Sequence, residues 1–247
     1  MNSIRKNLLA ITLLLLPFHF IIAQEITRDL KSFRKIIVSP RINLVLEKGD
    51  QESIRLVYTN VPADKINITI QNNTLRVYLD DAKVSEKTEQ VTPNERRSIY
   101  HNAYLTAYVT YKELEHLEIR GNQELTCNGP LRAERFTLKA YGENEIKLAS
   151  VKADYLRTSL YGENDLKIKG GKAEYQKYKL FGENRIDTHE LRSYSATTNT
   201  FGESQITLNT QDQLRINAFG ESQITYNGDA DVNKGLVFGN TTIHKLD

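Results

Sequence analysis

A six-residue phrase that recurs seven times decides the fold of this chain. It reads RGNQEL (120–125), YGENEI (141–146), YGENDL (161–166), FGENRI (181–186), FGESQI (201–206), FGESQI (219–224) and FGNTTI (238–243). Successive glycines are 21, 20, 20, 20, 18 and 19 residues apart. A nearly constant period of this length is the signature of a solenoid, in which each repeat stacks on its neighbours.

The repeat also predicts which side chains are buried. The fourth residue after each glycine is aliphatic in all seven units, from Leu125 to Ile243. Strand side chains alternate between two faces, so this position belongs on an inner face. Stacking at about 4.8 Å turns it into a continuous inner row, and the handedness rule for parallel crossovers makes the winding right-handed. The sequence therefore predicts an all-β fold, a right-handed parallel β-solenoid of about seven glycine-cornered coils.

The segment before the repeats has the alternation of half-buried strands. Apolar residues occur at every second position in runs such as Ile42, Leu44 and Leu46. Residues 24–118 are therefore predicted to form an N-terminal β-strand region that packs on, or continues, the solenoid at 119–247, so that the two make one domain. A charged loop at 80–103 interrupts the pattern. It is either a tolerated surface insertion or a lid or binding arm.

The first 23 residues have the pattern of a secretory signal peptide. Arg5 and Lys6 precede an apolar run that reaches Ile22, and cleavage is expected before Gln24. We therefore expect an exported protein that is periplasmic, on the outer surface or secreted. After processing it is not expected to be an integral membrane protein, because no second long apolar run follows.

The net charge limits the classes of binding partner to be expected, and the cysteine content limits the possible disulfides. Removal of residues 1–23 takes away two of 33 basic residues and none of 31 acidic ones, which leaves 31 of each. A neutral mature chain does not have the basic excess of a nucleic-acid-binding protein, so no nucleic-acid partner is expected. Cys127 is the only cysteine, so no intramolecular disulfide forms. Its repeat position predicts a buried, unreactive thiol.

Three segments together resemble a known family. They are FRKIIVSPRINLVLEKGDQESIRLVY (33–58), KINITIQNNTLRVYL (65–79) and the repeats that follow LEHLEIRGNQEL (114–125). Over residues 30–247 the chain resembles the head GIN domain family, proteins of gram-negative bacteria that are named as auto-transporter adhesins. The resemblance implies a signal peptide, a β-solenoid and no established catalytic residues. Many members have small residues at the corner, where this chain has aromatic-Gly-Glu-Asn.

The corner residues form the candidate binding strip. An aromatic residue precedes the glycine and a glutamate follows it in five consecutive repeats. The strip consists of Tyr141, Tyr161, Phe181, Phe201 and Phe219 with Glu143, Glu163, Glu183, Glu203 and Glu221. We expect the rings to stack as part of the fold inside the corner. If strand alternation runs unbroken through the corner, they instead form an exposed strip suited to a sugar or a protein.

The negative charges of the glutamate column are expected to be offset by nearby positive charges. Carboxylates one coil apart repel by roughly 1 kcal/mol even in water. Candidate ion-pair partners are Lys139, Lys147, Lys167 and Lys179. Calcium is an alternative because it prefers oxygen ligands, although the glycine-aspartate nonapeptide of calcium-binding solenoids is missing from the sequence. The asparagines after the first glutamates are expected to form a stacked hydrogen-bonded ladder.

The sequence contains no recognisable catalytic motif. Its histidines have no metal-ligand spacing, and neither G-x-S-x-G nor a P-loop occurs. We therefore expect a non-catalytic exported module for binding, adhesion or cell-envelope structure, without a cofactor. Its partner would be a polysaccharide or an envelope or surface protein. The alternative is a carbohydrate-processing lyase or glycosidase, which needs only two or three acidic residues on one face. Lys245 ends an inner row with a charge, so any homo-oligomer should form laterally.

Overall fold

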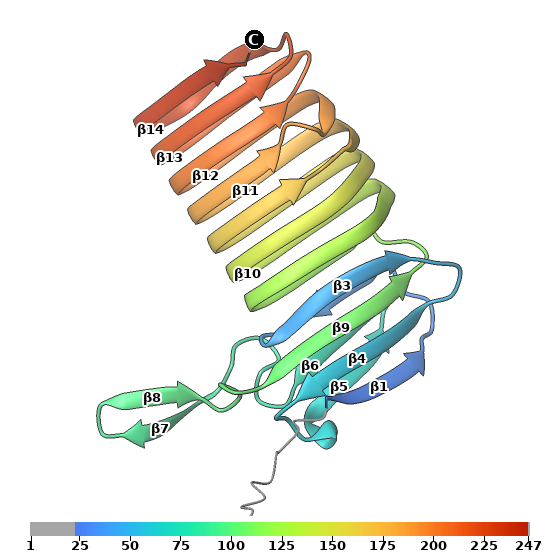
Figure 1. Ribbon diagram of the computed structural model, residues 1–247. Coiled ribbons are helices and arrows are strands. Elements are labelled where there is room, and N and C mark those ends of the chain that lie inside the picture. The colour runs from blue at the N-terminus through green and yellow to red at the C-terminus, as the bar shows by residue number, and fades with distance from the viewer. Residues whose placement is uncertain (1–22, 247) are drawn as a thin grey trace, which may run out of the picture.

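The computed structural model describes residues 23–246, so the expected signal peptide, 1–23, lies outside them except for Ala23. The chain is an all-β structure in which a stack of coils continues from an N-terminal β region (Figure 1). One short 3-10 helix, η1, spans Ala63–Lys65. The strands are β1 (Gln24–Asp29), β2 (Lys35–Val38), β3 (Ile42–Lys48), β4 (Ser53–Thr59), β5 (Ile66–Gln71), β6 (Thr74–Leu79), β7 (Thr88–Thr92), β8 (Glu95–Ser98), β9 (Tyr104–Tyr111), β10 (His116–Ile168), β11 (Gly171–Thr188), β12 (Arg192–Asn209), β13 (Gln213–Asn227) and β14 (Asp231–Lys245). Among residues 23–246, no helix has the length and hydropathy of a membrane span.

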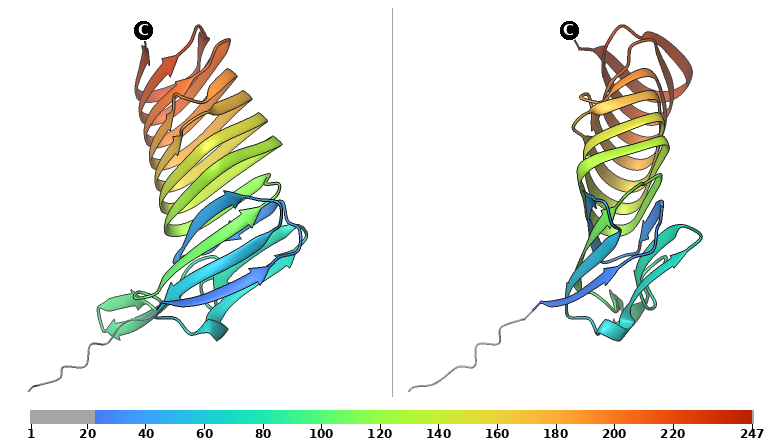
Figure 2. Two further views of the ribbon diagram at one scale, coloured as in Figure 1. Left: turned by 45° about the vertical axis from the view of Figure 1, so that its right-hand side comes forward. Right: turned by 90° about the vertical axis from the view of Figure 1, so that its right-hand side faces the viewer.

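The repeats form the predicted parallel β-solenoid. Strands β10 to β14 pair in parallel with equivalent residues opposite one another, so Phe181 faces Phe201 and Phe201 faces Phe219. Figure 2 shows the coils as flattened rings stacked along one axis. The solenoid has about five turns instead of the expected seven coils. The prediction counted one coil for each of the seven glycine corners.

The glycine at each corner is required by both conformation and space. All seven repeat glycines have φ between +96° and +119°, a region that L side chains rarely adopt. A Cβ on Gly182 would lie 2.5 Å from the carbonyl oxygen of Gly162. Each coil therefore rests on the backbone of the coil before it at this corner.

The N-terminal region and the solenoid share one sheet and one hydrophobic core. Strand β10 pairs in parallel with both β2 and β3, so Leu125 lies opposite Leu44 in the same inner row. The sheet continues through β9, β4 and β1, and β2 also pairs with β6. A single cluster of buried apolar side chains extends from Phe33 to Ala230. The first coils therefore stack on the strands that precede them in sequence.

The 80–103 segment, expected to be a charged loop, contains an antiparallel hairpin of β7 and β8. The hairpin projects from the body beside the N-terminal region (Figure 1). Its base is held by Glu86, which pairs with Arg41 at 2.8 Å and accepts hydrogen bonds from Ser98 and from the backbone amide of Tyr100. Local strand pairing and this carboxylate thus give the charged segment a defined conformation.

Cys127 is buried, as its repeat position predicted. Its side chain is 1% exposed, and the thiol donates a hydrogen bond to the carbonyl of Gly129 at 3.4 Å. The Tyr111 hydroxyl lies 3.5 Å from Sγ. Burial raises the pKa of the Cys127 thiol. Less of the nucleophilic thiolate is therefore present at neutral pH.

Candidate functional site

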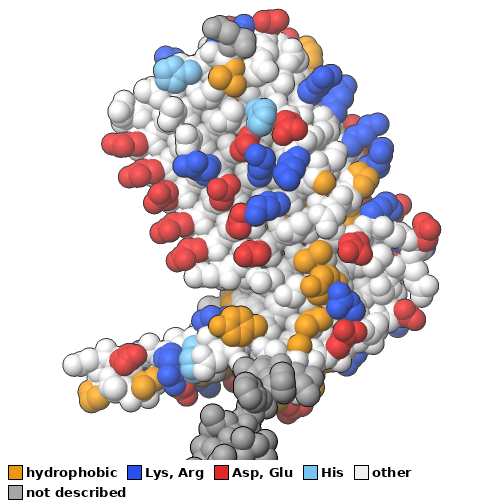
Figure 3. Space-filling model, in the orientation of Figure 1, with side chains coloured by type: hydrophobic (Ala, Val, Ile, Leu, Met, Phe, Trp, Pro, Cys, Tyr) orange, Lys and Arg blue, Asp and Glu red, His pale blue; other side chains and the backbone are white. Residues whose placement is uncertain are grey.

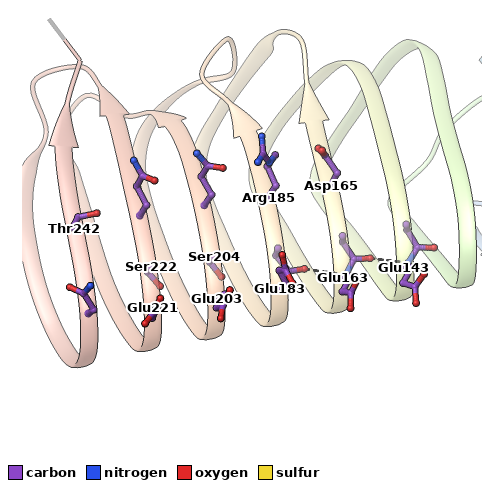
Figure 4. Close-up of a pocket in the computed structure, with 16 residues that line it drawn as sticks. Glu143, Glu163, Asp165, Glu183, Arg185, Glu203, Ser204, Glu221, Ser222 and Thr242 are labelled. Carbon is purple, nitrogen blue, oxygen red and sulfur yellow. Dashed lines mark hydrogen bonds between the residues drawn. The ribbon is translucent and has the colours of Figure 1, made fainter.

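A groove runs along the corner of the solenoid across successive coils. Its volume is about 610 Å³. Because strand side chains alternate, the first and third residues after each glycine point outward and form the two rims, and the second points inward. One rim consists of Glu143, Glu163, Glu183, Glu203, Glu221 and Asn240, and the other includes Asp165, Arg185, Gln205, Gln223 and Thr242 (Figure 4). All five glutamates of the candidate strip therefore line one groove.

The predicted asparagine ladder lies between the two rims. Asn144 donates to the Asn164 side-chain oxygen at 2.8 Å, and Asn164 donates to Asn184 at 3.1 Å, as the dashed lines in Figure 4 show. These side chains are only 3–5% exposed. Ser204 and Ser222 continue the row, and the Ser222 hydroxyl lies 2.8 Å from that of Thr200. The ladder fixes the backbone that carries the rims.

The glutamates form an acidic row without cationic partners. They are exposed, and a row of acidic side chains follows one edge of the solenoid in Figure 3. Glu143 accepts a hydrogen bond from Asn122 at 3.0 Å. Within residues 23–246, none of the five makes an ion pair with a lysine, arginine or histidine. The like charges one coil apart are screened by solvent alone.

The prediction that nearby lysines offset this charge is wrong. Lys147 pairs with Glu145 at 2.5 Å, and Lys167 pairs with Asp187 at 3.1 Å. Lys139 and Lys179 occur three residues before their glycines, on the sheet that leads into the corner. Neither lysine makes an ion pair within residues 23–246, and the row glutamates follow the glycine on the other side of the corner.

No preformed metal centre accompanies the acidic row. The part of the chain that the structure describes contains no group of three or more His, Cys, Asp or Glu side chains placed to hold a metal ion. The carboxylates lie side by side along one rim, whereas calcium needs oxygen ligands that surround it. The row resembles a line of separate negative charges more than a coordination cage.

The aromatic residues stack, as expected, but on the outside of the solenoid. Six rings from Tyr141 to Phe238 form a continuous stack with centroids 4.7–5.3 Å apart and planes within 22° of parallel. Strand alternation runs unbroken through the corner, which points the rings away from the buried row. Most are half-buried, and Phe201 is 39% exposed. Each inner ring covers its neighbours' faces, so within the stack solvent meets ring edges. Among the described residues of the stack, only the end ring, Phe238, has a face without a ring or guanidinium partner.

We predict that Phe201→Ser lowers the free energy of unfolding by about 1–3 kcal/mol while the fold is retained. The change removes two ring pairs, with Phe181 at 4.7 Å and Phe219 at 4.9 Å, each worth about 0.5–1.5 kcal/mol. Urea unfolding followed by circular dichroism measures the loss. Tyr104→Ser is the control, since Tyr104 is 71% exposed and should change stability by less than about 0.5 kcal/mol. Equal effects of the two changes would contradict a stabilising role for the stack.

Arg120 takes the aromatic position in the first repeat and covers the end of the stack. Its guanidinium lies 4.6 Å from the ring centroid of Tyr141 and pairs with Glu118 at 2.5 Å. Hydrogen bonds from His116 and from Arg120 hold the pKa of the Glu118 carboxyl at about 2, although burial opposes this shift. A cation over the exposed ring face is favourable because the face is the negative part of the aromatic quadrupole.

The residues of the second rim of the groove do not stand out in the sequence. Asp165 and Arg185 vary between repeats, so no conserved-looking column pointed to them. The signal that identifies them is their position two residues after the rim glutamate, which strand alternation places on the same outer face.

Comparisons with solved structures show the same fold. A protein from Bacteroides fragilis, titled a "putative adhesin", has a TM-score of 0.73 at 19% identity, over 90% of this chain and 97% of its own. A "putative lipid binding protein" from Parabacteroides distasonis has a TM-score of 0.63 at 16% identity, with 90% and 97% coverage. A "putative adhesin" from Parabacteroides merdae has a TM-score of 0.61 at 18% identity, with 91% and 96% coverage. No curated protein matches the chain.

A family model covers most of the sequence. It matches residues 32–230, which include the N-terminal strands from β2 onward and all but the last glycine corner. The match agrees with the resemblance found in the three sequence segments. The chain therefore belongs to the family described as "Putative auto-transporter adhesin, head GIN domain".

Proposed function

We propose that this protein is an exported, non-catalytic binding module of the cell envelope whose acidic groove binds a ligand with a row of positive charges. The observation that carries the proposal is the row of five exposed glutamates along a groove of about 610 Å³. Their negative charges have no cationic partner among residues 23–246. A cationic ligand would relieve the repulsion between coils, so binding and stability should be linked.

The names of the relatives support binding as the class of activity. Adhesin and lipid binding, the terms in the titles of the solved relatives, both denote recognition and not a reaction. Export rests on the sequence pattern of residues 1–23. Cleavage before Gln24 would leave β1 whole, because that strand begins at Gln24 and pairs with β4 from there.

A carbohydrate-processing enzyme is the alternative, and one feature favours it. Glu163 and Asp165 are on facing rims of the groove, so two carboxylates could flank a substrate. Incubation of the mature chain with envelope polysaccharides, followed by assays for retention and for new reducing ends, separates the two functions. Retention without cleavage is the expected result. Release of reducing ends that is lost in Glu163→Gln would establish the enzyme.

Calorimetric titration of the mature chain with spermine tests whether the groove binds a ligand with a row of positive charges. Spermine is a linear tetraamine, and its charges can reach carboxylates of successive coils. We expect the triple variant Glu163→Gln, Glu183→Gln and Glu203→Gln to bind spermine at least about fivefold more weakly, since an exposed ion pair contributes about 0.2–1 kcal/mol.

The matched control carries the same change in charge on another edge of the solenoid. It combines Glu134→Gln, Asp154→Asn and Glu174→Gln, whose side chains are part of a separate pocket with Arg132, Lys152 and Lys172. This control should bind spermine within about twofold of the unmodified chain. Equal weakening in both variants would show that spermine responds only to net charge, and the proposed groove would be wrong.

A further inference from the structure

In each coil, the strand segment that precedes the corner has an outer face whose charge differs from that of the groove. In the coils that end at Gly142, Gly162, Gly182, Gly202 and Gly220, its outward positions are seven, five, three and one residues before the glycine, and of these only Ser159 is buried. The strand register aligns these positions in columns along the axis, as when Arg157 faces Lys177 and Lys177 faces Thr197. The column nearest the corner, one residue before each glycine, is the aromatic stack.

This face contains six basic residues and no acidic one. The basic residues are Arg135, Lys139, Arg157, Lys177, Lys179 and Arg215. All except Arg135 lie in the two middle columns. Within residues 23–246, the side chains of these five make no ion pair, hydrogen bond or cation–π contact. A set of unpaired like charges on one face lowers stability slightly, so an external anion would be favourable there.

Aromatic residues border this basic band on both sides. On the corner side is the stack from Tyr141 to Phe219, and on the other side Tyr155 stacks on Tyr175 with centroids 5.1 Å apart. Since the rings cover one another's faces, their edges meet the solvent. The edge of an aromatic ring is the positive part of its quadrupole. The aromatic borders therefore reinforce the attraction of the basic band for an anion.

Acidic rows outside the aromatic borders limit the width of the partner. The groove glutamates follow the aromatic stack across the glycine, and Glu134, Asp154 and Glu174 immediately precede the outermost column on the far side. A broad anionic surface, such as a bilayer of acidic lipids, would also meet the groove glutamates and be repelled there, whereas on the far side Glu134 and Glu174 are paired with Arg135 and Lys172. A narrow chain that runs along the solenoid axis would contact only the basic band.

We infer that this face binds a linear anionic polysaccharide lying parallel to the solenoid axis, its acidic groups held by the middle columns, with Arg157, Lys177 and Arg215 in one line. Single-stranded nucleic acid is also a narrow polyanion, but proteins hold it by stacking bases on free aromatic faces. Here the faces within the stack are occupied by neighbouring rings. The site is separate from the groove and does not depend on the cationic ligand proposed for it.

Binding of the mature chain to immobilised dextran sulfate and polygalacturonate, with neutral dextran as reference, tests this inference. We expect both polyanions to retain the protein, neutral dextran not to, and retention to fall steeply with salt. The triple variant Arg157→Gln, Lys177→Gln and Arg215→Gln should bind about tenfold or more weakly. Its slope of log affinity against log salt should fall by about 2, from the value of about 0.7 per charge for single-stranded polyanions.

The matched control removes three positive charges from the segments that follow the corner glycine in their coils. It combines Lys147→Gln, Lys167→Gln and Lys169→Gln, none of which lines the groove, and should bind within about threefold of the unmodified chain. Equal loss in the two variants, or no retention on either polyanion, would overturn the inference. Binding to an oligothymidylate that is as tight as binding to the polyanions, or tighter, would also overturn the inference and favour single-stranded nucleic acid. The same result with vesicles of phosphatidylcholine and phosphatidylglycerol in equal parts would favour an acidic membrane. Circular dichroism of each variant separates lost binding from lost folding.

Discussion

Gly182→Ala is expected to lower the free energy of unfolding by about 3 kcal/mol or more, the largest effect of any single change considered for this chain. Gly182 has φ of +96°, and an added Cβ would lie 2.5 Å from the carbonyl oxygen of Gly162. A strained conformation of this kind costs about 1–3 kcal/mol alone. The contact adds to that cost, because the opposing atom belongs to the backbone of a stacked coil and cannot move independently.

Gly170→Ala is the matched control for this prediction. The nearest atom to a Cβ at Gly170 is the carbonyl oxygen of Ala149 at 3.8 Å, an ordinary contact, and its φ is outside the left-handed region. Its effect should stay within about 1 kcal/mol. Urea unfolding of the two variants beside the unmodified chain measures the difference. If Gly182→Ala were no more destabilising than Gly170→Ala, the corners could not be in the tight stacking that the structure shows.

Asn164→Ala is expected to cost about 3 kcal/mol. Asn164 occupies the middle of the buried ladder, where it accepts from Asn144 at 2.8 Å and donates to Asn184 at 3.1 Å. Alanine leaves the Asn144 amide without its acceptor and the Asn184 carbonyl without its donor. Each buried group left unpaired costs about 1–3 kcal/mol. The loss should appear as a lower urea midpoint with an unchanged slope, because the amount of surface exposed on unfolding hardly changes.

Asn184→Ser provides the comparison from the chain's own repeats. The next two coils have Ser204 and Ser222 at this position, so serine is compatible with the corner backbone. The change removes one ladder bond, from Asn164, and leaves the bond between Asn144 and Asn164 intact. It should cost less than half as much as Asn164→Ala. An equal cost would mean that the asparagines stabilise each corner separately instead of through the ladder.

The architecture of the solenoid could be predicted from the sequence because stacking makes every coil repeat the same requirement. An inner row favours apolar side chains because it is removed from water, so Leu125, Ile146 and their equivalents recur at fixed spacing. A corner that rests on the preceding backbone admits only glycine. Burial and backbone geometry are imposed by neighbours in the same sequence pattern, and the pattern therefore records them.

The same reasoning does not determine which outward side chains contact one another. Residues that are far apart within a repeat become neighbours only when the chain folds into a coil. The sequence alone left open the direction of the aromatic residues and offered Lys139 and Lys179 among the candidate partners of the glutamates. The folded chain places those lysines on the sheet before the corner and the glutamates beyond it. Counted over residues 24–247, the sequence by itself determined equal numbers of acidic and basic residues, whereas the coil geometry divides these charges into an acidic groove and a basic band. The physical reason is that solvent tolerates many outward residues at each position, so only their three-dimensional arrangement decides which charges lie together.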